Sequence, residues 1–162
     1  MRTGFQEGLL IEAVAKAVSM SADLVRRATM MTGEVGLVAM AALKGGEAAV
    51  SSLKVEPLHV IKPMLAAVSP SVEEALAEHG GTSAFEYKLD GARVQIHVLD
   101  GTVRIWSRRV TDMTASLPDM VQLVRANLST HSLILEGEVV ATGRDGRPLP
   151  FQHLMRRFRR KR

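Results

Sequence analysis

The stretch RVQIHVLDGTVRIW, residues 93–106, decides the fold of this chain. Apolar Val94, Ile96 and Val98 alternate with polar residues, as in a half-buried β-strand. Asp100-Gly101 is a typical two-residue hairpin turn. Folding the chain there matches apolar with apolar and polar with polar residues, in the pairs Val98–Val103, Ile96–Ile105, Gln95–Trp106 and His97–Arg104. The stretch therefore predicts an antiparallel hairpin.

Further elements are expected on both sides of this hairpin. The predicted segments are, in chain order, a helix from Val72 to His79 ended by Gly80-Gly81, a strand from Ala84 to Lys88, a helix from Pro118 to Leu128, a strand from Ser132 to Ala141 and an amphipathic helix from Phe151 through Phe158. Strands and helices in this order predict an α+β fold with an antiparallel sheet.

The first third of the chain is expected to be helical. Three apolar stripes recur at three- and four-residue spacing: Leu9, Leu10, Ala13, Val14, Ala17 and Val18; then Leu24, Val25 and Ala28; then Leu37, Val38, Ala41 and Ala42. Ser21 is a good N-cap for the second helix, and Gly45-Gly46 is expected to end the third. Pro57 and Pro63 predict a linker. The expected division is a helical part at 1–56, a linker at 57–66 and an α+β part at 67–162.

Composition limits the classes of function. Cysteine is absent from the 162 residues, which excludes disulfides and thiolate metal sites and favours a reducing cytoplasm. The chain shows neither a secretory signal nor an apolar run long enough to span a membrane. The five histidines lack metal-ligand spacing, so no zinc site is expected. The net charge of +4 suits a polyanionic partner, although residues 156–162 supply much of it.

The six residues KLDGAR, Lys88 to Arg93, indicate nucleotidyl chemistry. A lysine that attacks phosphorus must first lose a proton, which desolvation or the neighbouring Arg93 would promote. Gly91 would let the backbone turn tightly beside a ligand. The simpler alternative is that Asp90-Gly91 is only a turn and Lys88 an exposed charge.

Two downstream motifs favour the interpretation that Lys88 acts on a nucleotide. Glu136 and Glu138 lie two residues apart on a predicted strand, so both carboxylates face the same side. Such like charges need a cation, a ribose hydroxyl or an arginine nearby, although two solvated acids would give the same pattern. Ser107-Arg108-Arg109 follows the hairpin and offers guanidinium groups to phosphate oxygens, or is simply a solvated pair.

The three motifs in this order resemble ATP-dependent DNA ligases of the archaeal and bacterial type. Residues 86–93, EYKLDGAR, closely resemble the family's nucleotidyl-lysine motif. Arg2-Thr3-Gly4 with Glu7-Gly8-Leu9 resembles the later part of the family's helical DNA-binding domain, and His59 to Ala66 resembles the join to the adenylation (nucleotidyltransferase) domain. The segment from Gly146 into the basic ending is also similar to the archaeal branch.

The resemblance implies a role for each matching residue. Lys88 would be adenylated, Glu86 would contact adenine, and Arg93 the ribose or phosphates of ATP. The other implied nucleotide contacts are Asp90, Gly91, Arg108 and Glu138, the implied Mg²⁺ ligands are Glu138 and Glu136, and the implied DNA contacts are Arg2, Thr3, Gly4 and Arg109. It also implies nicked duplex DNA as substrate, a monomeric complete enzyme, and work in repair, replication and recombination.

The resemblance covers only part of such an enzyme. The start of the helical domain, the later lysine motifs and the OB-fold domain have no counterpart here, so the sequence is expected to be a fragment. One alternative is a truncated ligase without activity that binds DNA through its basic ending. Another is an RNA ligase or capping enzyme, because these share the Lys-x-Asp-Gly motif; the helical first part favours DNA ligase.

Overall fold

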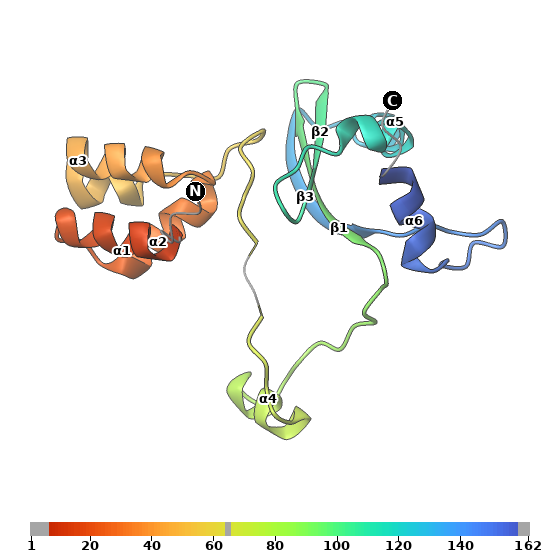
Figure 1. Cartoon of the computed structure of the whole chain (residues 1–162), viewed down its shortest axis with the longest axis horizontal. Helices are drawn as coiled ribbons and strands as arrows, with labels where there is room; N and C mark the ends of the chain where they lie inside the picture. Colours follow the sequence, from red (N-terminus) through yellow and green to blue (C-terminus); the bar gives the residue numbers. More distant parts are fainter. Residues whose placement is uncertain (1–6, 64–65, 159–162) are drawn as a thin grey trace, which may run out of the picture.

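The computed structural model describes residues 7–63 and 66–158 and contains a three-stranded antiparallel sheet (Figure 1). Its strands are β1 (Ala92–Leu99), β2 (Thr102–Ser107) and β3 (Ser132–Val139), in the order β2-β1-β3. The predicted hairpin register is confirmed at all four pairs, including His97 with Arg104. Asp100 and Gly101 have φ of 44° and 79°, the left-handed pair that a type I′ turn needs.

One face of the sheet packs against helices. Helix α5 (Pro118–Asn127) and helix α6 (Phe151–Phe158) lie on the same side of the sheet, after the short 3₁₀ helix η1 (Thr114–Ser116) (Figure 1). The core between them consists of Val94, Ile96, Val98, Val103, Ile105, Leu117, Val124, Val139 and Leu154. Five of these residues, Val94, Ile96, Val98, Val103 and Ile105, are the apolar positions of the predicted hairpin, so the α+β prediction and the burial of the hairpin's apolar face are confirmed.

The first part of the chain forms three helices, α1 (Glu7–Ala17), α2 (Ala22–Thr32) and α3 (Val35–Ser51). Their shared core consists of Ile11, Ala15, Val25, Ala28, Val38, Ala42 and Val50. The stripe predicted for the first helix is partly wrong, because Leu9 is 57% exposed. Ile11 and Ala15, four residues apart, form the buried line instead. Helices α2 and α3 cover only that side of α1.

Two predicted boundaries shift. Gly46 breaks the helical path with φ of 63°, yet α3 resumes and runs to Ser51, because Val50 packs into the core. Gly45-Gly46 therefore bends the helix without ending it. Strand β3 ends at Val139 rather than Ala141, which pairs with Leu149 through a backbone hydrogen bond of 2.7 Å.

The strand predicted at Ala84 to Lys88 is wrong. Helix α4 (Val72–Glu78) forms as expected, with Ser71 Oγ accepting from Glu74 N–H, and the chain turns at Gly80 and Gly81. Residues 82–89 then run without regular structure. A strand needs a neighbour to receive its backbone hydrogen bonds, and the described residues provide none. None of the described helices is both long and apolar enough to cross a bilayer.

Candidate functional site

A cleft of about 820 Å³ opens beside the sheet, within the range typical of small-molecule sites. Seven of the residues predicted to act on a nucleotide line it: Glu86, Lys88, Gly91, Arg93, Arg108, Glu136 and Glu138. They come from the irregular segment before β1, from β1 itself, from the turn after β2 and from β3. The fold thus gathers residues that are up to 52 positions apart (from 86 to 138) into one concave surface.

Lys88 lies on the irregular segment and is exposed, as are its neighbours Glu86 and Tyr87. The described residues therefore do not bury the lysine, so they do not provide the desolvation that the sequence analysis offered as one possibility. What the structure provides is proximity to charge, since Arg93 and Arg108 line the same cleft. Both guanidinium groups therefore share the concave surface that Lys88 lines.

Gly91 is the point of closest approach between the motif and β3. A Cβ atom at this position would lie 2.4 Å from the carbonyl oxygen of Val139 and 2.8 Å from Glu138 Cγ. Any side chain would push the Lys88 segment away from the strand that carries Glu138. The glycine is therefore needed for close packing against β3 rather than for the tight turn that the sequence suggested, because its φ is outside the left-handed region.

Asp90 does not line the cleft. Its Oδ2 atom accepts a 3.3 Å hydrogen bond from the backbone N–H of Phe151, the first residue of α6. The first N–H groups of a helix lack intrahelical partners, so this carboxylate satisfies one of them and suits the positive end of the helix. Asp90 thereby anchors the motif to α6, a structural role that the sequence did not suggest.

Arg93 and Glu136 form an ion pair across β1 and β3. Glu136 also accepts a 3.1 Å hydrogen bond from Gln95 Nε2, so both of its oxygens are engaged. Glu138 lies opposite Arg93 in the strand register and is exposed. Among residues 7–63 and 66–158, Glu138 has no hydrogen-bond or ion-pair partner, so its carboxylate is available to a ligand.

Of the two arginines predicted to contact ligands, Arg108 and Arg109, only the first lines the cleft. Arg108 lines the cleft, whereas Arg109 is exposed and is absent from the cleft wall. Arg2, Thr3 and Gly4, the other predicted DNA contacts, lie outside the described residues. Within the described chain, no group of three or more histidine or carboxylate side chains is arranged to hold a metal ion.

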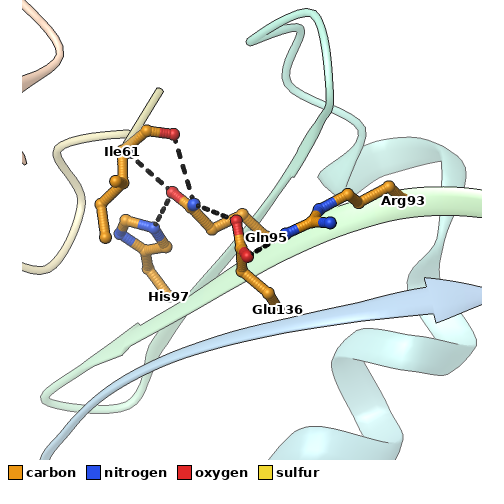
Figure 2. Close-up of polar contacts among 5 residues, drawn as sticks. All are labelled: Ile61, Arg93, Gln95, His97 and Glu136. Carbon is orange, nitrogen blue, oxygen red and sulfur yellow. Dashed lines mark hydrogen bonds and ion pairs between the residues drawn. The ribbon is translucent and has the colours of Figure 1, made fainter. Parts of the chain in front are cut away.

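A polar network beside the cleft was missed by the sequence analysis (Figure 2). Gln95 and His97 project from the face of β1 opposite the apolar core, and they are 5% and 0% exposed. The linker covers them. Leu58 N–H donates to His97 Nδ1 at 2.8 Å, and Ile61 N–H donates to Gln95 Oε1 at 2.8 Å. The only available signal was the pair of long polar residues inside an otherwise apolar strand.

The protonation of His97 follows from its partners. A backbone N–H only donates, so Nδ1 must be the acceptor and the proton of the neutral ring resides on Nε2. That Nε2–H donates to Gln95 Oε1 at 2.7 Å. Burial lowers the pKa of His97, and the nearby His59 lowers it further. The ring also packs edge-on against Trp106, with centroids 4.7 Å apart.

Among the described residues of the basic ending, Arg157 takes part in contacts within the fold. Arg157 forms a two-pronged ion pair with Asp119 and donates from Nε to the Ser116 carbonyl at 2.9 Å. The hydrogen bond from Arg157 holds the pKa of Asp119 below its usual range. Arg157 thus joins α6 to α5 and has little left to offer to a phosphate. Arg156 is exposed.

Comparison with known proteins identifies the family. The family model described as "ATP dependent DNA ligase domain" matches residues 63–162, which is more than half of the chain. This chain belongs to the ATP-dependent DNA ligase domain family. The match includes the entire cleft wall, from Pro63 to Glu138, and α6. The residues of the cleft can therefore be compared with those of other members of this family.

Relatives from archaea and bacteria match nearly the whole chain. A DNA ligase of Methanothrix thermoacetophila is 50% identical over 161 residues, covering 99% of this chain and 28% of the relative. A DNA ligase of Thermococcus fumicolans is 46% identical, with 99% and 29% covered. A probable DNA ligase of Anaeromyxobacter sp. is 48% identical, with 99% and 31% covered. The chain thus spans about three tenths of the length of these relatives.

Among solved structures, the ligase domain of M. tuberculosis LigD is similar to part of this chain. The sequences are 34% identical, the TM-score is 0.39, and the match covers 48% of this chain and 25% of that one.

Proposed function

We propose that this chain is part of a DNA ligase that seals nicks in duplex DNA through a lysyl-AMP intermediate on Lys88. The observation that carries the proposal is the single cleft lined by Lys88, two arginines and three acidic residues. The membership of the ATP-dependent DNA ligase domain family and the similarity to archaeal and bacterial DNA ligases support it. They also favour DNA over RNA as the nucleic acid.

The first reaction is a nucleotidyl transfer from ATP. The deprotonated Nζ of Lys88 attacks the α-phosphorus, a P–N bond forms, and the bond to the bridging oxygen breaks so that pyrophosphate leaves. In the second reaction, the 5′-phosphate at a nick attacks the same phosphorus and frees the lysine. In the third, the 3′-hydroxyl attacks the activated 5′-phosphate and AMP leaves. Positioning and charge neutralisation dominate such steps.

The cleft residues divide into groups of opposite charge. Lys88 and Arg108 supply positive charge to the phosphates, and Arg93 adds to it from β1. Glu86, two residues before the lysine, lines the same cleft and would contact the base, as the family resemblance implies. Gly91 holds this segment against β3, so that Lys88 and Glu138 remain part of one site.

The donor set fits Mg²⁺ held jointly with ATP. Magnesium typically takes one or two protein carboxylates and completes its shell with phosphates and water. Glu138 is the carboxylate available for this, with Glu136 beside it but engaged by Arg93 and Gln95. When bound, the ion would offset charge on the phosphates.

We further propose the domain division given above, with residues 1–56 as the end of a helical DNA-binding domain and 67–162 as the start of the adenylation domain. The separate cores of α1–α3 and of the sheet support it. In this division, Arg109 contacts DNA from the turn after β2, and Arg2, Thr3 and Gly4 contact it from the helical part.

The test is covalent labelling. The purified chain is incubated with α-³²P-ATP and Mg²⁺ and separated by denaturing electrophoresis, beside Lys88→Ala and Lys54→Ala. Lys54 is an exposed lysine that does not line the cleft, so it controls for nonspecific labelling. The proposal expects a label in the unaltered chain and in Lys54→Ala but none in Lys88→Ala. A label that survives Lys88→Ala would refute it.

Sealing is tested on the full-length parent with a nicked duplex. Lys88→Ala should abolish the sealing of an ordinary nick. On DNA that is already adenylated, Lys88→Ala should abolish sealing only if Lys88 also acts in the last step. DNA binding that depends on salt and survives Lys88→Ala, together with no adenylate in either protein, would support the DNA-binding remnant instead.

A further inference from the structure

We infer that Gln95 is a positioning residue: its carboxamide holds the linker backbone at Ile61 and orients the Glu136 carboxylate for Arg93 in the cleft. The role in catalysis rests on the proposed function, whereas the contacts do not. Gln95 is outside the cleft wall, since only Arg93 and Glu136 of this network line it. It acts through them (Figure 2).

All four hydrogen-bonding positions of the Gln95 carboxamide are occupied. Oε1 accepts from Ile61 N–H at 2.8 Å and from His97 Nε2–H at 2.7 Å. Nε2 donates to the Ile61 carbonyl at 3.3 Å and to Glu136 Oε1 at 3.1 Å. A buried amide with every partner in place has one orientation, because turning it over would bring like groups together. The orientation of Gln95 is therefore set by the linker and by His97.

The Gln95 amide in turn fixes the orientation of the Glu136 carboxylate. One of its oxygens accepts from Gln95, and the other pairs with the Arg93 guanidinium. Without the Gln95 donor, nothing else among the described residues fixes the first oxygen, so the carboxylate is free to rotate. Arg93 would then lose its fixed partner and its direction toward the cleft.

The linker is held from its other side by the helical part. Lys62 N–H donates to the Met30 carbonyl of α2 at 3.1 Å, and the Val60 carbonyl packs against Gly33, where a Cβ would come within 2.4 Å. Leu58 has φ of 70°, an uncommon conformation for leucine, and its N–H is bonded to His97. Such a conformation persists where surrounding contacts enforce it. The linker thus joins α2 to the network that reaches Arg93.

The experiment compares Gln95→Met with Arg104→Gln in the complete 162-residue chain. Methionine has nearly the shape of glutamine and lacks its hydrogen bonds. Arg104 extends from the same sheet face, pairs with Asp112 and is outside the cleft, so its variant controls for loss of a polar contact on that face. Far-UV circular dichroism establishes that each variant is folded.

The catalytic readout is the rate of lysyl-adenylate formation against ATP concentration. Loss of one oriented charged contact to ATP should raise the half-maximal ATP concentration about tenfold in Gln95→Met, equivalent to about 1.4 kcal/mol. The maximal rate should change less, because Lys88 is untouched. Arg104→Gln should behave as the unaltered chain. A folded Gln95→Met with unchanged ATP dependence would overturn the inference, even if it melts earlier.

A second variant perturbs the network from the linker. Ile61→Pro removes the N–H that Gln95 Oε1 accepts and leaves every cleft side chain in place; Ile61→Val retains that N–H. The NMR signal of the Arg93 side chain should shift in Ile61→Pro and in Gln95→Met and remain in place in Ile61→Val. Amide exchange at Leu58 should accelerate in the same two variants.

These NMR readouts need no ATP, so they separate the two proposals. If the unaltered chain forms no adenylate but the Arg93 signal responds to Ile61→Pro, the proposed function fails and the positioning role stands. If adenylate forms and the Arg93 signal ignores both variants, the positioning role is overturned and the proposed function stands.

Discussion

Gly91→Ala tests whether the motif must lie directly against β3. The added methyl group would lie 2.4 Å from the Val139 carbonyl oxygen and 2.8 Å from both Glu138 Cγ and Val140 Cγ1. The nearest of these atoms belongs to the backbone of a sheet strand, which cannot turn aside as a flexible side chain would. The segment that carries Lys88 must therefore move away from the strand.

The magnitude combines two opposing effects. Overpacking of this kind costs about 1–3 kcal/mol. Replacing glycine also restricts the unfolded chain, which offsets about 0.4–1 kcal/mol. At the middle of these two ranges the net loss is about 1.3 kcal/mol, equivalent to a fall in Tm of about 3–5 °C for a chain of this size. Lysyl-adenylate formation should fall by more than the loss of folded protein accounts for, because Lys88 and Glu138 separate.

Denaturation is followed through Trp106, the single tryptophan, which packs on His97 of β1. Gly137→Ala is the matched control for stability. Gly137 lies on β3 as well, and a Cβ there would meet nothing within 4 Å. Its Tm should equal or exceed that of the unaltered chain. The reasoning is refuted if Gly91→Ala matches Gly137→Ala in Tm and the unaltered chain in labelling.

Three further predictions follow from individual contacts. Because the pKa of His97 is lowered in the folded chain, the unfolded chain binds more protons below pH 6.5; stability should therefore be full above pH 6.5 and fall as pH drops toward the folded pKa, by at most about 1.4 kcal/mol per pH unit from this residue. Urea titrations between pH 5 and 8 should show that slope, and His97→Gln should lack it. Asp90→Ala should lower the free energy of unfolding by about 0.5–2 kcal/mol, as removal of a helix cap does, whereas Asp90→Asn retains an acceptor for Phe151 N–H and should lose less; equal loss in both variants would contradict the capping role. Arg157→Gln should lower Tm by breaking the pair with Asp119, an effect of at most about 1 kcal/mol for so exposed a pair, and Arg156→Gln should not.

The sheet could be predicted because its signals are local. The alternation around Ile96 and the Asp100-Gly101 turn together fix the hairpin register, since a slip by one residue would place Gln95 in the apolar core. Glu136 and Glu138 were correctly placed on one face for the same reason. The residues of the cleft wall belong to motifs that lie at the start of β1, just after β2 and on β3.

What the sequence missed depends on contacts between distant segments. The segment from Ala84 to Lys88 has strand-like composition, but it becomes a strand only with a neighbour. His97 on a polar face suggests a solvated residue, and only the linker from Leu58 to Ile61 makes it a buried acceptor. Residues 58 and 97 are 39 positions apart, so no local pattern reports their contact.

The central claim, that Lys88 is the adenylated residue, is tested most directly by locating the AMP. The chain is incubated with ATP and Mg²⁺, digested, and its peptides are sequenced by tandem mass spectrometry. We predict AMP on the lysine of the peptide containing Tyr87-Lys88-Leu89, released by added pyrophosphate. AMP on another residue, or none on a folded chain that binds ATP, would contradict the account.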